Sequence, residues 1–282
     1  MDQSKLPVIP SNRLDDLHNL DVVDSCDLVL FMAGNQFMAM EEIIQAFQKE
    51  CPEVKKIYYE TLPPGLELKQ ILCGGAQFRD QILDVYPDIY SSVNEKGMHI
   101  LEKSGHIQKG AYHLYLHNRL ALMVPKGNPA DIRSISDMAR DNVRISQPDT
   151  ENEDIAFHIM DMYRQAGGDR LVHRVMEEKR AEGTTILTIV HHRETPLRIS
   201  KKTVDVGPVW ATELIHARSS GLAFDIVEPG DHLDQRDRIN YYVCKLKNAP
   251  HPQNAQKFFD FITSASAMKI YERYGFMAHY KS

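Results

Sequence analysis

The feature that most constrains the fold is a continuous apolar run at residues 28–33, which gives way within a few residues to a helical pattern. A strand that is apolar along its whole length is buried on both faces, as in the parallel sheets of α/β proteins. Gly34 and Asn35 interrupt the run, and apolar residues then recur at helical spacing from Phe37 to Phe47. The pattern predicts a strand, a short loop and a helix, with the strand inside a parallel sheet.

The same alternation continues along the chain. A second strand is expected at 54–59, a helix after the turn residues 63–65, and a third strand at 88–93. A β-α-β-α-β series favours a parallel sheet with right-handed crossovers. After extended segments and a turn cluster at 125–129, a second α/β series begins; its expected elements are strands at 143–146, 184–190 and 203–206 and helices at 150–165, 169–182 and from Thr195.

These patterns predict two α/β lobes joined by extended segments. Residues 1–25 are polar and aperiodic, so we expect an N-terminal arm there. Residues 26–122 together with 240–282 form the predicted first lobe, and residues 123–239 form the second. A chain of 282 residues has the usual length for two such domains.

Composition excludes several classes of protein. Lys and Arg number 33 against 39 Asp and Glu, a net charge of −6, which argues against a nucleic-acid-binding surface. No apolar run approaches the ~18 residues of a membrane span, and the four cysteines form no CxxC motif for zinc. Dinucleotide, phosphate-loop, nucleophile-elbow and HExxH motifs are absent from the sequence. We therefore expect no cofactor, no bound metal and no nucleic-acid partner.

The candidate binding residues lie where strands turn into helices. Asn35 and Gln36 follow the first strand, Gln147 and Thr150 follow a strand of the second lobe, and Thr150 with Glu153 fits a capping box. In parallel α/β sheets ligands bind outside the carboxyl ends of the strands. Helix N-termini there present free N–H groups that suit anions. The pattern indicates a site for a small anion between two facing lobes.

Two further junctions carry unusual residues. His191, His192 and Arg193 follow a predicted strand and precede a helix, so Arg193 is a candidate partner for an acidic group. The alternative is a structural network of Arg193 and Glu194 with a histidine. Trp210, the single tryptophan, ends a strand, and it is either part of a cleft wall or a buried core residue.

Four segments carry a family resemblance. They are the tail at 258–276 with its Tyr-Gly-Phe ending, the strand 88–92, the segment 122–129 and the segment 204–210. In this order they resemble a type II periplasmic solute-binding protein of an ABC importer, in the molybdate/tungstate-binding branch. The resemblance implies an α/β fold with two lobes, each a mostly parallel sheet flanked by helices, and a ligand cleft between the lobes.

The resemblance also implies a function. It indicates a non-enzymatic, monomeric receptor that captures a small anion, either an oxyanion or an organic acid, and delivers it to an ABC transporter permease. The family's serine after the third strand corresponds to Ser91 or Ser92, whereas Asn35 and Gln36 stand where serines are expected in the first loop. Amide side chains favour a larger acid over molybdate.

The location follows from the same resemblance. The N-terminus lacks the apolar stretch of an export signal, so the chain is either cytoplasmic or, as the resemblance implies, periplasmic or extracellular with its signal peptide outside this sequence. The alternatives are a cytoplasmic ligand-sensing domain and an enzyme on the same fold.

Overall fold

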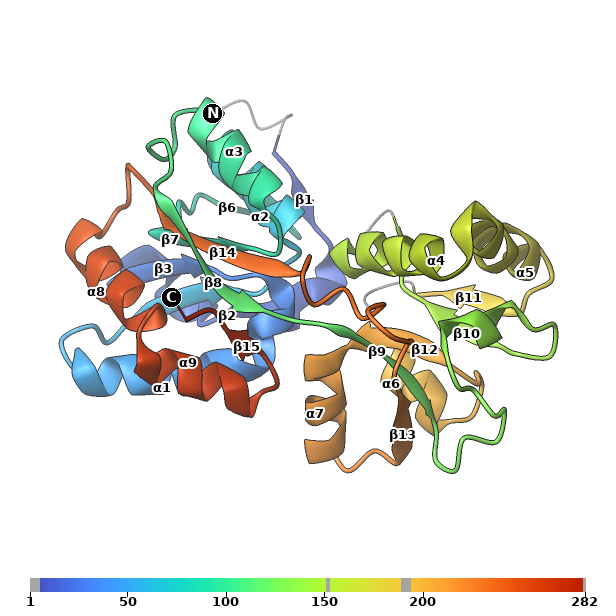
Figure 1. Cartoon of the computed structure of the whole chain (residues 1–282). Helices are drawn as coiled ribbons and strands as arrows, with labels where there is room; N and C mark the ends of the chain where they lie inside the picture. The colour runs from blue at the N-terminus through green and yellow to red at the C-terminus, as the bar shows by residue number, and fades with distance from the viewer. Residues whose placement is uncertain (1–5, 151–152, 189–193, 281–282) are drawn as a thin grey trace. The chain divides into compact units, whose positions relative to one another are not determined.

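The computed structural model describes residues 6–150, 153–188 and 194–280, and it contains two compact units (Figure 1). Unit 1 comprises residues 1–117 and 240–282, and unit 2 comprises residues 118–239. The chain leaves unit 1 after His117 and returns at Asn240, whereas the sequence analysis placed the first crossover at 122–123.

Unit 1 is built on one mixed sheet of seven strands. At its centre β3 (Leu28–Phe31) lies between β4 (Ile57–Glu60) and β7 (Ile89–Ser92), parallel to both. These are the three strands of the predicted β-α-β-α-β series. The flanking strands are antiparallel to their neighbours: β14 (Asn240–Lys245), β8 (Tyr112–His117) and β15 (Met277–Ala278) beyond β7, and β2 (Leu17–His18) beyond β4.

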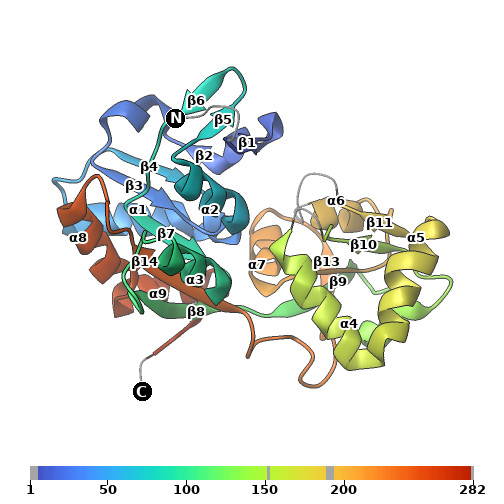
Figure 2. The same ribbon diagram turned by 90° about the horizontal axis from the view of Figure 1, so that it is seen from above.

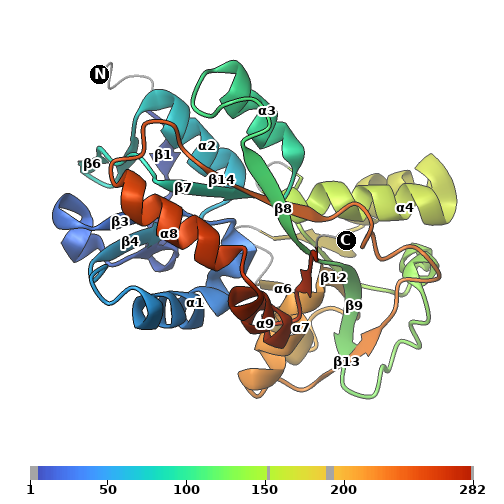
Figure 3. The same ribbon diagram turned by 60° about the vertical axis from the view of Figure 1, so that its left-hand side comes forward.

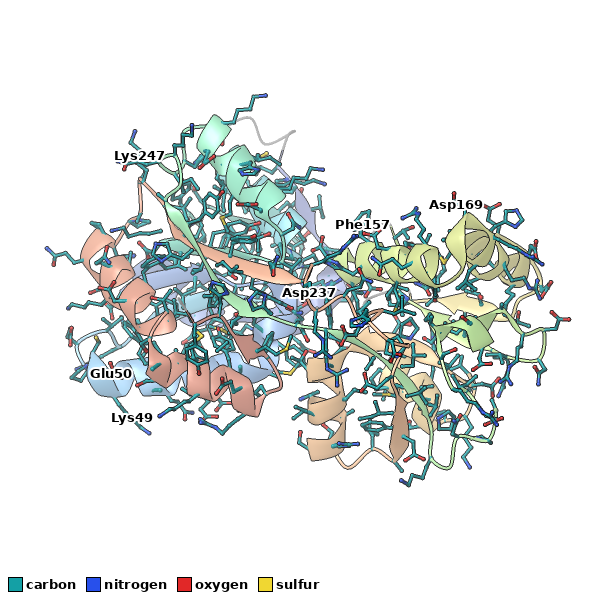
Figure 4. The ribbon with its side chains drawn as sticks, viewed as in Figure 1. Lys49, Glu50, Phe157, Asp169, Asp237 and Lys247 are labelled. Carbon is teal, nitrogen blue, oxygen red and sulfur yellow. The ribbon has the colours of Figure 1, made fainter. Side chains whose placement is uncertain are left out.

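Helices cover both faces of this sheet (Figures 1 and 3). One face carries α2 (Pro64–Cys73) and α3 (Glu95–Lys103), and the other carries α1 (Phe37–Glu50), α8 (Pro252–Ile262) and α9 (Ala265–Arg273). Phe47 of α1 and Phe258 of α8 are fully buried, with ring centroids 5.1 Å apart in an edge-to-face contact. The charged residues Lys49 and Glu50 at the end of α1 point outward (Figure 4).

The N-terminal segment is more ordered than the expected arm. Its described part begins with β1 (Val8–Ile9), which pairs with β5 (Ala76–Phe78) in a small sheet completed by β6 (Gln81–Leu83). The 3-10 helices η2 (Ser11–Asp16) and η3 (Leu20–Ser25) flank β2. Strands of two residues are too short to show an alternating pattern, so the sequence gives no periodic signal for them.

Unit 2 has an antiparallel sheet and a parallel pair of strands. In the sheet β9 (Leu120–Pro125) lies between β12 (Gly207–Trp210) and β13 (Phe224–Val227); the parallel pair is β10 (Ile145–Gln147) with β11 (Thr185–Leu187). Figure 2 shows α4 (Asp154–His173) on one side of the β9 sheet and α6 (Glu194–Ser200) and α7 (Ala211–Ser219) on the other. The remaining helical segments are η5 (Ile135–Ala139), η6 (Arg174–Glu178) and α5 (Lys179–Ala181).

Two local predictions in unit 2 are wrong. The helix expected from Thr150 begins at Asp154, and the Glu153 carboxylate accepts a hydrogen bond from Thr188 instead of closing a capping box with Thr150. The strand expected at 203–206 forms one bridge, at Val206, and the strand proper is β12. A strand can hold Pro208 here because β12 lies at the edge of its sheet, where one N–H is dispensable.

Candidate functional site

The polar residues of unit 1 gather at one edge of its sheet. Because β3, β4 and β7 are parallel, their carboxyl ends meet at the same edge, which is where ligands bind in α/β sheets. The uncharged polar residues at or just beyond these ends are each at most 4% exposed: Asn35, Gln36, Thr61, Ser91 and Ser92. Four of them were predicted from the sequence.

Gln36 is the centre of a buried hydrogen-bond network. Its Oε1 accepts from the hydroxyls of Tyr115 (2.8 Å) and Tyr271 (2.7 Å), so its Nε2 is the donor to Ser91 Oγ at 2.9 Å. Ser91 Oγ also lies 2.8 Å from the Tyr115 hydroxyl. Since Tyr115 gives its proton to Gln36, Ser91 gives its own proton to Tyr115. In this state the hydrogen bonds of Gln36 and Ser91 stabilise the edge of the sheet.

Asn35 has a different environment. Its Nδ2 donates to the Tyr241 hydroxyl, and its buried Oδ1 has no hydrogen-bond partner among the described residues. Turning the amide by 180° lets Oδ1 accept from Tyr241 and presents the NH₂ group instead. A buried polar atom without a partner is unfavourable by about 1–3 kcal/mol, so this amide is suited to a ligand.

Ser92 lies apart from this network. Successive strand residues point to opposite faces, so Ser91 faces Gln36 while Ser92 faces α3. Ser92 Oγ accepts a long hydrogen bond of 3.4 Å from the backbone N–H of Asn94, and Asn94 Oδ1 in turn caps α3 through Gly97 N–H at 3.3 Å. The structure therefore brings Asn35, Gln36 and Ser91 to one side of the sheet and Ser92 to the other.

Thr61, which directly follows β4, was not among the predicted site residues. Thr61 is 1% exposed, and its Oγ1 lies 3.0 Å from Nε2 of His18. The His18 ring stacks on Tyr59, with centroids 4.1 Å apart and planes 4° from parallel. The signal that could have found Thr61 was its position between a predicted strand and the Pro63-Pro64 turn, equivalent to Asn35 after the first strand.

A buried carboxyl group lies beside Thr61. Glu60 is fully buried and ends β4; it accepts hydrogen bonds from Tyr58 (2.7 Å) and Gln70 (2.6 Å). Burial raises the pKa of Glu60 to about 7, although both hydrogen bonds act in the opposite direction. This edge of the sheet therefore carries a carboxyl group that titrates near neutral pH.

In unit 2 two of the predicted residues, Gln147 and Trp210, are buried. Gln147, at the end of β10, is fully buried; its Oε1 accepts from Tyr163 at 2.6 Å and its Nε2 donates to the Pro148 carbonyl. Trp210 is 2% exposed and lies edge-on to His158, whose pKa burial lowers to about 4. Thr150 is half-buried. The predicted residues His191, His192 and Arg193 lie outside the described residues.

A second arginine, not predicted, lies at the ends of β10 and β11. Arg198 of α6 donates to Ser146 Oγ (3.2 Å) and to the carbonyl of Leu187 (3.0 Å), and it forms an ion pair with Glu194 at 2.8 Å. Ser146 Oγ also contacts Thr195 Oγ1 at 2.8 Å. Arg198 lies a full helical turn into α6, and not where a strand turns into a helix. Reasoning from such junctions therefore does not identify it.

Apart from the Glu60 carboxyl group and the ion pair of Arg198 with Glu194, the chemistry at both edges is that of neutral hydrogen-bonding groups. Hydroxyl and amide side chains dominate, and Arg198 is neutralised by Glu194. Within residues 6–150, 153–188 and 194–280, no group of three or more His, Cys, Asp or Glu side chains is arranged to hold a metal ion, and no helix is long and apolar enough to cross a membrane. Such groups suit a polar solute held by hydrogen bonds.

Gly34 permits close packing between the loop after β3 and the loop after β4. A Cβ at Gly34 would lie 2.9 Å from the carbonyl oxygen of Thr61 and 3.1 Å from that of Leu62.

We expect Gly34→Ala to lower the free energy of unfolding by about 1–3 kcal/mol, since backbone must move. Gly65→Ala in α2 is the matched control, because its Cβ meets nothing within 4 Å and alanine favours the helix by about 0.5–1 kcal/mol. Urea unfolding of both variants should give changes of opposite sign, and a neutral Gly34→Ala would contradict the packing described here.

Comparison with known proteins gives a consistent result. A family model for bacterial extracellular solute-binding proteins matches residues 28–277. A putative ABC transporter substrate-binding lipoprotein of Bacillus subtilis, YvgL, is 23% identical over 252 residues, covering 89% of this chain and 86% of that protein.

Two solved structures share the fold. The periplasmic molybdate-binding protein of Azotobacter vinelandii is 15% identical, covers 90% of this chain and 100% of its own, and has a TM-score of 0.70. The sulfate-binding protein SubI of Mycobacterium tuberculosis is 17% identical, covers 88% of this chain and 85% of its own, and has a TM-score of 0.68. The predicted fold class, α/β of the type II periplasmic-binding-protein kind, is confirmed. The expectation of a mostly parallel sheet in each lobe is wrong, because the unit 1 sheet is mixed and the β9 sheet of unit 2 is antiparallel.

Proposed function

This chain belongs to the bacterial extracellular solute-binding proteins, and on that premise we propose that it captures a small anion and delivers it to the permease of an ABC transporter. The family match over residues 28–277 carries the proposal, because it spans both compact units. The family binds solutes and does not catalyse reactions, which argues against an enzyme. Its extracellular location argues against a cytoplasmic sensor.

The anionic class of the solute is supported by two observations. Relatives with the same fold bind molybdate in one case and sulfate in another, by their names. Apart from Glu60, whose carboxyl group is bonded to Tyr58 and Gln70, the edge of the unit 1 sheet carries hydroxyl and amide groups. Such groups hold oxyanions through hydrogen bonds. Asn35 supports this further, since its amide can present an NH₂ group to an oxyanion.

The individual binding residues and the kind of anion are also proposals. We propose that Asn35, Gln36, Ser91 and Ser92 from unit 1 act together with residues of unit 2. The predicted unit 2 residues are Gln147, Thr150, His191, His192, Arg193 and Trp210. The choice between an inorganic oxyanion and an organic acid depends on Arg193, because a charge-assisted hydrogen bond is about twice as strong as a neutral one. If the solute is a carboxylate or a phosphate, Arg193→Ala should therefore weaken its binding more than Ser92→Ala does.

A ligand panel tests the proposal directly. Protein unfolded and refolded to remove bound solute is titrated with molybdate, tungstate, sulfate, phosphate and citrate, with glucose and choline as neutral and cationic controls. At ~100 times its dissociation constant a bound anion should stabilise the protein by ~2.7 kcal/mol. This raises the melting temperature by about 5–10 °C for a protein of this size. Stabilisation by glucose or choline and by none of the anions would contradict the anion proposal and leave the family membership intact.

A further inference from the structure

The N-terminal segment reaches the carboxyl edge of the unit 1 sheet, although it precedes the region that the family model matches. The match begins at residue 28, whereas β2 (Leu17–His18) already pairs with β4. Because β2 runs antiparallel to β4, Leu17 lies opposite Glu60, and the 3-10 helix η2 before it lies beyond the end of β4. The backbone N–H of Thr61 donates to the carbonyl of Asp16 at 2.9 Å. This segment therefore borders the candidate site.

The segment holds one imidazole in a defined orientation. His18 is fixed by the face-to-face stack on Tyr59 and by the 3.0 Å contact between Nε2 and Thr61 Oγ1. Thr61 is itself buried and packs against the Gly34 backbone. The imidazole thus contacts the hydroxyl of Thr61, the residue that directly follows β4.

A buried ion pair fixes the conformation of η2. Arg13 and Asp16 are 9% and 2% exposed, and Arg13 Nη1 lies 3.2 Å from Asp16 Oδ2. Burying an ion pair is often no more stabilising than an apolar contact of similar size. An apolar contact could therefore cover the edge of the sheet equally well. The pair does fix the position of the Asp16 carbonyl, and through it the position of Thr61.

We propose that this N-terminal segment sets the hydrogen-bonding character of the solute site, with His18 as the positioning residue for the Thr61 hydroxyl. The inference rests on the proposed function. A hydroxyl has one proton to donate. When His18 Nε2 carries a proton, it donates to Thr61 Oγ1, and the Thr61 proton is available for an anionic oxygen. When His18 Nε2 is unprotonated, Thr61 donates to it and offers only lone pairs, which an anion repels. With a proton on Nε2 of His18, the segment favours anionic solutes.

A double-mutant cycle tests this role. The four proteins are wild type, His18→Phe, Thr61→Ala and the double variant, titrated by calorimetry with molybdate and sulfate. Phenylalanine keeps the stack on Tyr59 and removes the hydrogen bond. We expect His18→Phe and Thr61→Ala each to weaken binding of the anion about five- to tenfold, the size of one hydrogen bond. In the Thr61→Ala background His18→Phe should have no further effect, because His18 acts through Thr61.

Two controls separate positioning from folding. His18→Gln places an amide N–H near the position of Nε2 and should restore most of the affinity. His106→Phe is the matched control: His106 is also half-buried, stacked on Tyr86 and bonded to that hydroxyl at 2.7 Å, but it lies next to Lys247, near the amino end of β7. It should leave the affinity unchanged.

The outcomes distinguish this inference from the proposed function. Wild-type affinity in His18→Phe, or losses in the two single variants that simply add in the double variant, would overturn the role of His18 while anion binding by the wild type stands. If the wild-type protein binds neither these anions nor any other, the proposed function fails and the inference fails with it. Melting temperatures of all variants, measured without ligand, show whether each is folded under the conditions of the titration.

Discussion

Replacing Gln36 by leucine is expected to lower the free energy of unfolding by roughly 3–5 kcal/mol. Leucine has a similar volume but no polar atoms, so the buried hydroxyls of Tyr115 and Tyr271 lose their acceptor and Ser91 loses its donor. Each buried polar group left without a partner is unfavourable by about 1–3 kcal/mol. The three groups can partly re-pair with one another, which places the total below the sum.

Gln45→Leu is the matched control for this experiment. Gln45 is on the same helix, is exposed, and makes one hydrogen bond to Glu41 within α1. Its replacement should change the free energy of unfolding by less than about 0.5 kcal/mol. Urea unfolding followed by circular dichroism measures both variants. If Gln36→Leu were as mild as Gln45→Leu, the network would not contribute to stability, and Gln36 would be free to serve the solute alone.

The strands and helices that carry the site could be predicted because their signal is local. The apolar run at 28–33 and the helical spacing after Phe37 are properties of neighbouring residues, and both elements form as expected. Since parallel strands end at one edge, the positions of Asn35, Gln36 and Ser91 followed from the same reasoning. The order of three strands and two helices was enough to place them at one edge.

The partners of these residues could not be predicted, because they are distant in the sequence. Gln36 contacts Tyr115 and Tyr271, which lie 79 and 235 positions further along the chain. Nothing in the local pattern around Gln36 indicates whether its amide faces a ligand or buried tyrosines. For the same reason Ser91 and Ser92 were equally good candidates, although the sheet separates them onto opposite faces.

The elements β2 and η2 were not predicted for a second reason, which is that they are short. β2 has two residues and η2 has six, so neither shows a periodicity that can be recognised. Their stability comes from tertiary contacts: Leu17 is 6% exposed, and the carbonyl of Asp16 accepts a hydrogen bond from the backbone N–H of Thr61. A polar, aperiodic stretch is thus compatible with an arm or with an ordered border of the site, and only the folded structure distinguishes the two.

The Glu60 carboxyl group gives the folded protein a pH dependence at the same edge. The Gln70 amide lies 2.6 Å from Glu60 Oε2, a length usual for O–H···O contacts, and Gln70 Oε1 is buried without a partner among the described residues. The short distance fits a protonated Glu60 that donates to Gln70 Oε1 once that amide is turned by 180°. In this state the buried carboxyl group is neutral and donates its proton to Gln70.

Stability is therefore expected to fall as the pH rises from about 4.5 to about 7, and Glu60→Gln should abolish that fall. The pKa of Glu60 is raised from its ordinary 4.5 to about 7, so within this window the folded protein holds a proton that the unfolded chain has lost. One pKa unit corresponds to about 1.4 kcal/mol, which limits the loss to about 3 kcal/mol at pH 8.

Glutamine at position 60 supplies the N–H that the carboxylate lacks, so Glu60→Gln should be more stable than wild type at pH 8 and about equal to it at pH 4.5. Urea unfolding at several pH values measures the difference between the two proteins. Taking this difference cancels other titrating groups such as His158, whose lowered pKa acts in the opposite direction. A difference that does not change with pH would mean that the pKa of Glu60 is the same in the folded and the unfolded protein, which would contradict the raised pKa.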